Sequence, residues 1–148
     1  MFIEKYVHYQ YCLSMNTEID RKIAVILVAD VVGYSKHMEK DENSTITNYS
    51  ACERILNKLL KKFKGSVFNT GGDSVLVEFP SAVNAVECGV AFQNEIKKRN
   101  TSDKTDVKLE FRLGINMGDV VNKEGNLIGD GVNIAARLEA LAQPNGIT

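Results

Sequence analysis

Residues 23–30 read Ile-Ala-Val-Ile-Leu-Val-Ala-Asp, an apolar run of strand length that stops abruptly at Asp30. A run without polar alternation is typical of a central strand that is covered on both faces of its sheet. We therefore predict a buried strand here, with the carboxylate of Asp30 at the point where the strand ends.

Downstream of this strand, the sequence predicts a helix and then a hairpin. Between residues 41 and 63 the apolar residues recur at i, i+3 and i+4, which is the pattern of an amphipathic helix. Residues 66–70 and 74–79 read as two short strands, and Gly71-Gly72-Asp73 between them is a hairpin signal. Asp73 is therefore expected in a turn.

The second half of the chain begins with another predicted helix, which Ser81 can cap and which runs to about Arg99. Its inward-facing residues are expected to be Ala82, Val83, Val86 and Val90. Residues 107–116 alternate between apolar and polar side chains and predict a half-buried strand. Residues 118–121 and 126–128 predict a further strand and its return, joined by a short hairpin.

The last predicted helix begins near Gly131. Asn133, Arg137 and Leu141 follow at four-residue intervals, so they share one face of this helix. The predicted order is strand, helix, strand, strand, helix, strand with extra elements. That order predicts the α+β fold class, with a ferredoxin-like βαββαβ core, a mostly antiparallel sheet and helices packed on it.

Length and composition predict one globular domain over residues 21–148, preceded by an irregular extension over residues 1–20. Eighteen basic against 19 acidic residues give a net charge of -1, which argues against partners such as nucleic acid or an anionic membrane. Cys12, Cys52 and Cys88 form neither a disulfide framework nor a zinc pattern. With no apolar run long enough to span a membrane, a cytoplasmic location is expected.

Asp30 and Asp73 are the candidate metal ligands. A βαββαβ sheet places the hairpin turn beside the end of the first strand, so the two carboxylates are expected to converge. Hard divalent cations such as magnesium prefer oxygen ligands of this kind. Gly71 and Gly72 would let the backbone pass close to a ligand. The alternative interpretation is that both aspartates simply form turns.

Four ordered segments resemble the class III adenylyl and guanylyl cyclase domains. They read LVADVVGYSK at 27–36, NTGGDSVLVEFPSAVNAVECGV at 69–90, FRLGINMGDVV at 111–121 and GDGVNIAARLEALAQPNGI at 129–147. The resemblance covers residues 21 to 148. It implies that Asp30 and Asp73 bind two Mg²⁺ or Mn²⁺ ions per site, with the carbonyl group of Val31 as a further ligand.

By the same resemblance, Asn133 orients the ribose and Arg137 stabilises charge at the α-phosphate. The implied reaction converts ATP to 3′,5′-cyclic AMP and pyrophosphate in intracellular signal transduction. ATP is favoured over GTP as the nucleotide. The resemblance further implies a homodimer, in which the metal aspartates and the Asn/Arg pair of one site come from opposite subunits.

The chain departs from the family pattern at two base-reading positions. Asn69 and Asn126 stand where adenylyl cyclases carry Lys and then Asp or Thr, and where guanylyl cyclases carry Glu and Cys-like residues. A second hypothesis is therefore a degenerate cyclase-like module that dimerises or binds nucleotide without turnover. A third, a diguanylate cyclase, rests on Gly71-Gly72-Asp73 alone. Family domains also continue beyond the position of Thr148, so weak or no activity is expected of the chain by itself.

Overall fold

The computed structural model describes residues 19–102 and 106–148, so most of the predicted extension over residues 1–20 lies outside the described residues. Its helices and strands are, in chain order, β1 (Asp20–Val31), α2 (Tyr34–Lys40), α3 (Glu42–Phe63), β2 (Ser66–Gly71), β3 (Ser74–Phe79), α4 (Ala82–Thr101), β4 (Phe111–Lys123), β5 (Asn126–Ile128) and α5 (Asp130–Leu141). The short helix α2 was not anticipated from the sequence.

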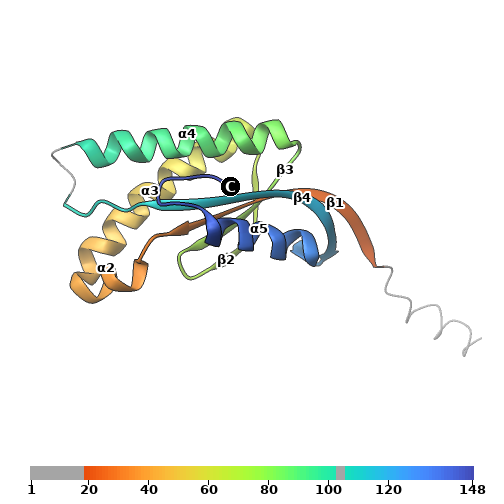
Figure 1. The fold of residues 1–148 in the computed structure, drawn as a ribbon, viewed down its shortest axis with the longest axis horizontal. Helices are drawn as coiled ribbons and strands as arrows, with labels where there is room; N and C mark the ends of the chain where they lie inside the picture. The colour runs from red at the N-terminus through yellow and green to blue at the C-terminus, as the bar shows by residue number, and fades with distance from the viewer. Residues whose placement is uncertain (1–18, 103–105) are drawn as a thin grey trace, which may run out of the picture.

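The strands form one sheet in the order β2-β3-β1-β4-β5, and every neighbouring pair is antiparallel. The apolar run at 23–29 lies in the central strand β1, as predicted (Figure 1). Four of these strands with α3 and α4 give the βαββαβ core in its ferredoxin-like order. The predicted α+β fold class is therefore confirmed.

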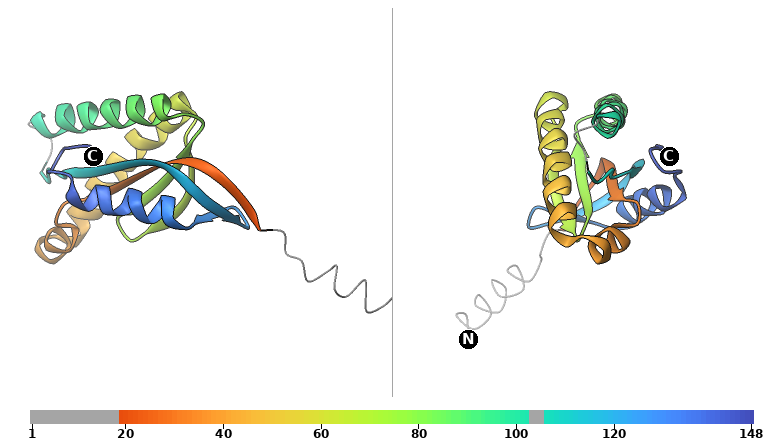
Figure 2. Two further views of the ribbon diagram at one scale, coloured as in Figure 1. Left: turned by 45° about the vertical axis from the view of Figure 1, so that its right-hand side comes forward. Right: turned by 90° about the vertical axis from the view of Figure 1, so that its left-hand side faces the viewer.

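Helices cover both faces of the sheet, but unequally (Figure 2). Alternate residues of β1, from Val25 to Val31, pack against α3 and α4 in the larger hydrophobic cluster. The intervening residues Ala24, Ile26 and Val28 belong to a second, smaller cluster that includes Ala135 of α5. We call the surface on this second side the α5 face of the sheet.

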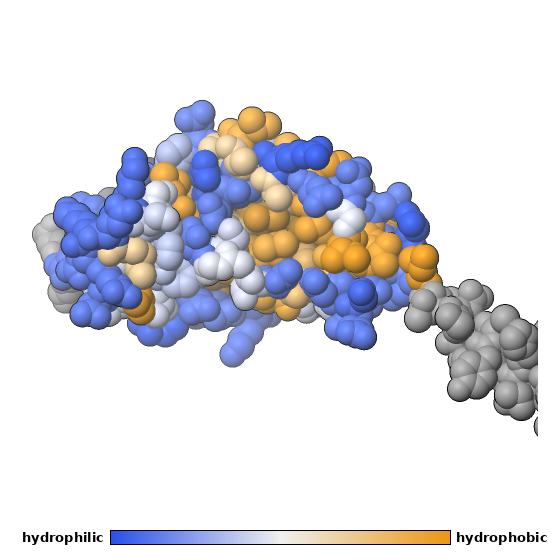
Figure 3. All heavy atoms as spheres, turned by 90° about the horizontal axis from the view of Figure 1, so that it is seen from below, coloured by the Kyte–Doolittle hydropathy of each residue, from blue (hydrophilic) through white to orange (hydrophobic). Residues whose placement is uncertain are grey.

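The α5 face is only partly covered. Phe68 of β2, Leu76 of β3 and Val132 of α5 pack against the smaller cluster but remain partly buried. Seen from below, apolar side chains gather on the underside of the molecule (Figure 3). A contiguous apolar area on a protein surface commonly marks an interaction site.

Side chains cap the starts of α3 and α4, and the cap at Ser81 was predicted from the sequence. The Asp41 side chain accepts a hydrogen bond from the backbone N–H of Ser44 at the start of α3. The Ser81 side chain accepts one from the backbone N–H of Asn84 at the start of α4. Each cap satisfies a backbone donor that the helix itself leaves unpaired.

The predicted inward face of α4 was wrong. Val83, Val86 and Val90 are exposed, and so is Ala82. The buried stripe consists instead of Ala85, Cys88, Gly89, Phe92 and Ile96. The helix carries two apolar stripes, and the one with the larger side chains, Phe92 and Ile96, is buried because it removes more apolar surface from water.

The strand boundaries in the second half also differ from the prediction. β4 is a single strand that begins at Phe111, not near residue 107, and it continues through Gly118. Gly118 does not mark a break: a side chain there would come within 3.3 Å of the Gly131 Cα, so glycine allows α5 to approach the sheet. The hairpin through Glu124 and Gly125 was correctly predicted, with positive φ angles of 54° and 85°.

At Gly114 the backbone of α5 lies so close to β4 that a larger residue should destabilise the fold. A Cβ atom at this position would lie 2.2 Å from the backbone nitrogen of Glu139 and 2.3 Å from the carbonyl oxygen of Ala135. Because backbone atoms cannot rotate away, we expect Gly114→Ala to lower the free energy of unfolding by about 3 kcal/mol. Urea denaturation measures this directly.

The matched control is Gly71→Ala. A Cβ atom at Gly71 would meet nothing within 4 Å, and the residue does not have a positive φ angle. We expect its free energy of unfolding to change by less than about 1 kcal/mol. Equal effects of the two substitutions would show that the α5 contact at Gly114 is not the cause.

Over the described ranges, the chain has no helix that combines the length and the apolar character needed to cross a membrane.

Candidate functional site

Asp30 is the second-to-last residue of β1, and it lies on the α5 face of the sheet. It lies opposite Arg112 of β4, one step from the end of the strand pairing. The side chain is 18% exposed, because the sheet and α5 enclose most of it. Its Oδ1 atom accepts a hydrogen bond of 2.7 Å from the hydroxyl group of Ser74.

Asp73 lies in the turn between β2 and β3, and the pairing of β3 with β1 brings this turn to Asp30. Ala29 pairs with Val75, so residues just before Val75 lie beside those just after Ala29. The two carboxyl groups interact directly, and the backbone N–H of Val31 donates a hydrogen bond to Asp73. The sequence-based expectation that the two aspartates converge is met.

The environment of Asp73 favours a bound cation. Burial, followed by the negative charge of Asp30, raises the pKa of Asp73, while backbone hydrogen bonds act in the opposite direction. Two carboxylates that share a small space repel each other, and a divalent cation between them relieves the repulsion. The donor set therefore fits a magnesium or manganese ion.

The protein supplies only part of a coordination shell. In the regions that the structure describes, there is no group of three or more His, Cys, Asp or Glu side chains that could hold a metal ion. Magnesium in particular retains waters or takes substrate phosphates as its remaining ligands. Two carboxylates suit a cation that binds together with a phosphate-bearing substrate.

Ser74, Arg112 and Glu139 complete the surroundings of Asp30, and the sequence analysis missed all three. Arg112 lies between two carboxylates: its Nη2 is 3.5 Å from Asp30 Oδ2, and its Nε is 3.0 Å from Glu139 Oε1. Burial, followed by the charge of Asp30, raises the pKa of Glu139, and Arg112 lowers it. A charged residue at a sheet-facing helix position was the available signal for Glu139.

Tyr49 of α3 lies on the other side of the aspartate pair. Its ring makes an edge contact with Tyr34 at a centroid distance of 5.7 Å. Burial, followed by the charges of Glu53 and Asp73, raises the pKa of Tyr49 to about 12. The phenol therefore stays protonated at neutral pH and remains a hydrogen-bond donor near the carboxylates.

Asn133 and Arg137 are not brought to the aspartate pair. Both are exposed on α5, whereas Gly131, Ala135 and Glu139 of the same helix are buried against the sheet. Residues two positions from a buried residue lie about 200° around the helix from it. Within one chain, the predicted Asn/Arg pair thus faces outward.

The remaining predicted residues, Asn69, Gly71, Gly72 and Asn126, lie on or next to the edge strands β2 and β5. Asn69 is exposed on β2, and Asn126 lies at the start of β5, a strand that comes close to β2. The Oδ1 atom of Asn126 is buried and accepts no hydrogen bond. Gly71 at the end of β2 and Gly72 in the turn that carries Asp73 are exposed, and side chains there would meet open space.

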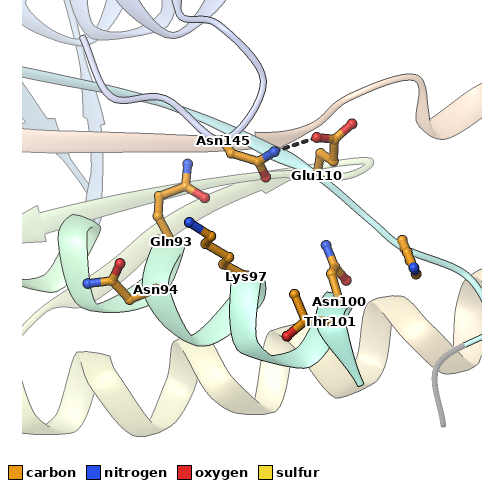
Figure 4. A pocket seen from close by; sticks show the side chains of 8 residues that line it. Gln93, Asn94, Lys97, Asn100, Thr101, Glu110 and Asn145 are labelled. Atoms are coloured by element: carbon orange, nitrogen blue, oxygen red, sulfur yellow. Dashed lines mark hydrogen bonds between the residues drawn. The ribbon is translucent and has the colours of Figure 1, made fainter. Parts of the chain in front are cut away.

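A pocket of about 620 Å³ lies elsewhere, between α4, the segment just before β4 that carries Lys108 and Glu110, and Asn145 (Figure 4). Gln93 and Lys97 of α4 point toward Asn145, which is hydrogen-bonded to Glu110. None of the residues predicted for the site lines this pocket. The aspartate pair, not this pocket, is therefore the candidate functional site.

Two curated relatives of this chain are named as adenylate cyclases. A Rhizobium meliloti (strain 1021) protein provisionally named adenylate cyclase 3 is 48% identical over 130 residues, which are 87% of this chain and 22% of that protein. The adenylate cyclase of Streptomyces coelicolor is 29% identical over 132 residues, 87% of this chain and 32% of that protein. No family model matches the chain.

A solved structure agrees with these relatives. The adenylate/guanylate cyclase/hydrolase of Silicibacter pomeroyi superposes with a TM-score of 0.80 at 33% identity, covering 88% of this chain and 76% of that one. The chain thus spans most of a solved cyclase domain. It spans only about a fifth to a third of the two curated relatives.

Proposed function

Because the chain belongs to the class III adenylyl and guanylyl cyclase family, we propose that it forms the catalytic part of an adenylate cyclase. In the reaction, the ribose 3′-oxygen of ATP forms a bond to the α-phosphorus, and the bond to pyrophosphate breaks. The products are 3′,5′-cyclic AMP and pyrophosphate. The observation that carries this proposal is the meeting of Asp30 and Asp73 at the end of β1.

Asp30, Asp73 and the carbonyl group of Val31 would hold two Mg²⁺ or Mn²⁺ ions. When bound, these ions supply activation of the attacking oxygen and neutralisation of the leaving pyrophosphate. The chain's own contribution is to hold the two carboxylates together and to leave room for the triphosphate. Open space around Gly71 and Gly72 supports a close approach of phosphate groups to this turn.

A second copy of the chain would complete the site. The outward direction of Asn133 and Arg137 on α5 is what a partner subunit's aspartate pair requires. The partly buried apolar residues of the α5 face support an interface on that side. In a two-fold dimer both sites are equivalent, so Asn133 would orient the ribose and Arg137 would stabilise charge at the α-phosphate of the opposite site.

Asn69 and Asn126 would contact the purine base of the nucleotide. They lie on β2 and β5, the two edge strands of the sheet, which come close to each other. A side-chain amide offers both a donor and an acceptor, so each asparagine could pair with the exocyclic amino group or a ring nitrogen of adenine.

Base recognition can be tested by assaying ATP and GTP separately with manganese, followed by product identification. We expect cyclic AMP from ATP, and we expect Asn69→Lys with Asn126→Asp to raise the turnover of ATP about tenfold, which corresponds to about 1.4 kcal/mol. The added Lys and Asp offer a charged donor and a charged acceptor to the base. The single substitutions Asn69→Lys and Asn126→Asp serve as controls, because the gain in ATP turnover should need both side chains.

One alternative is a cyclase-like module that binds nucleotide without turnover. The two asparagines at the base-reading positions favour it, since both replace charged or stronger partners. Nucleotide binding by calorimetry without any cyclic product, in the original chain and in the Asn69→Lys, Asn126→Asp variant alike, would select this alternative. Formation of a cyclic dinucleotide from GTP would instead reject the adenylate cyclase.

A further inference from the structure

The ion pair between Arg112 and Glu139 adjoins the candidate metal ligand Asp30, because Arg112 contacts both carboxylates. Arg112 Nε lies 3.0 Å from Glu139 Oε1, while Arg112 Nη2 lies 3.5 Å from Asp30 Oδ2. The guanidinium group is thus closer to Glu139 than to Asp30. The contact with Glu139 is an ion pair without hydrogen-bond geometry, whereas Nη2 donates a long hydrogen bond to Asp30 Oδ2. Both contacts are largely shielded from water, with side chains that are 30%, 10% and 18% exposed for Arg112, Glu139 and Asp30.

Arg112 competes with any cation for Asp30. Oδ1 of Asp30 already accepts the hydrogen bond from Ser74, so Oδ2 is the oxygen that Arg112 faces. A guanidinium group that closed on this oxygen would neutralise the carboxylate and occupy a coordination position. At 3.5 Å, Arg112 Nη2 donates only a long hydrogen bond to this oxygen, so the closure is partial.

The position of Glu139 is fixed by the fold. Its backbone nitrogen packs against Gly114, so closely that a Cβ atom on Gly114 would come within 2.2 Å of it. The residue is 8% exposed on the sheet-facing side of α5. The backbone of Glu139 is therefore held in place, and its carboxylate attracts the guanidinium group away from Asp30.

We propose that Glu139 is a positioning residue that restrains Arg112, and that this restraint keeps Asp30 available to divalent cations. The inference rests on the proposed function, because it concerns the same pair of aspartates. Loss of the restraint lets Arg112 close on Asp30 Oδ2, and the affinity of the site for cations falls. The Arg112–Glu139 pair thereby sets the cation affinity of the aspartate pair.

The test is binding of Mn²⁺ alone, measured by the electron paramagnetic resonance signal of the free ion at pH 8.5. We expect Glu139→Gln to weaken binding about fivefold, and Arg112→Gln to strengthen it. Glu139→Asp is the decisive variant. It keeps the negative charge, but its shorter side chain places the carboxylate farther from the Arg112 guanidinium group. The proposal expects Glu139→Asp to weaken binding as well, and an affinity equal to that of the original chain would overturn it.

A double-mutant cycle separates restraint from simple charge. If Glu139 acts through Arg112, Glu139→Gln has at most a small effect in the Arg112→Gln background. Equal fold-changes in both backgrounds would mean that Glu139 acts only by its charge, and the proposal would be rejected. Thermal melting of each variant shows that it is folded.

The matched control is Glu78→Gln, which makes the same chemical change in the Lys22–Glu78 ion pair of 2.7 Å elsewhere on the sheet. Its Mn²⁺ affinity should equal that of the original chain. Asp30→Asn tests the premise: if the original chain and Asp30→Asn bind Mn²⁺ equally, the proposed metal site itself is wrong, and the inference falls with it. Binding that needs Asp30 but ignores Glu139 rejects the inference alone.

Discussion

Replacing Asp30 by Asn should lower the rate of cyclic AMP formation about a thousandfold, which corresponds to about 4 kcal/mol of transition-state stabilisation. The substitution removes the negative charge and one of the two anionic oxygens that would hold the cations, while its size stays the same. Ser74 can still donate its hydrogen bond to the remaining Oδ1 atom. Chromatographic quantification of cyclic AMP in the presence of manganese measures the loss.

The fold should survive this substitution. Asp30 is a cause of the raised pKa of Asp73, so its neutralisation removes a repulsion in the cation-free protein. We expect the melting temperature of Asp30→Asn without metal to be no lower than that of the original chain. Asp20→Asn is the matched control, at the opposite end of β1, where Asp20 is exposed and contacts Asn122. Activity above a tenth of the original in Asp30→Asn would contradict the role of this carboxylate.

The aspartate pair could be predicted because it depends on strand order alone. An apolar run that ends in Asp30 and a Gly-Gly-Asp turn at Asp73 are visible in the sequence. A βαββαβ connection then places the hairpin beside the first strand, since β3 pairs with β1 in this topology. No side-chain detail is needed for the two carboxylates to come together.

The Arg112–Glu139 pair could not be predicted, because it depends on how closely α5 approaches β4. Glu139 is a charged residue on the buried face of an amphipathic helix, which sequence periodicity assigns to apolar residues. The absence of a side chain at Gly114 lets the helix backbone lie against the strand and bring Glu139 to Arg112. A charge on the buried face marks Glu139 as unusual, but its partner is set by tertiary packing and cannot be read from the local sequence.

Mixing two inactive variants should restore activity if the site is shared between subunits. Asp30→Asn and Arg137→Ala would each be inactive alone, because every site of either homodimer lacks one of the two groups. After mixing and exchange of subunits, half of the dimers are mixed, and each of these has one intact site out of two. We therefore expect about a quarter of the original activity.

The matched control for this mixture is Asp30→Asn with Asp73→Asn. Both substitutions fall in the same half of the site, since the two carboxyl groups of one chain interact directly. A mixed dimer of these variants has no intact site, so no activity should return. Recovery in this control, or none in the Asp30→Asn and Arg137→Ala mixture despite proven subunit exchange, would contradict the shared site. The exposed position of Arg137 would then require another explanation, because within one chain α5 directs it away from Asp30 and Asp73.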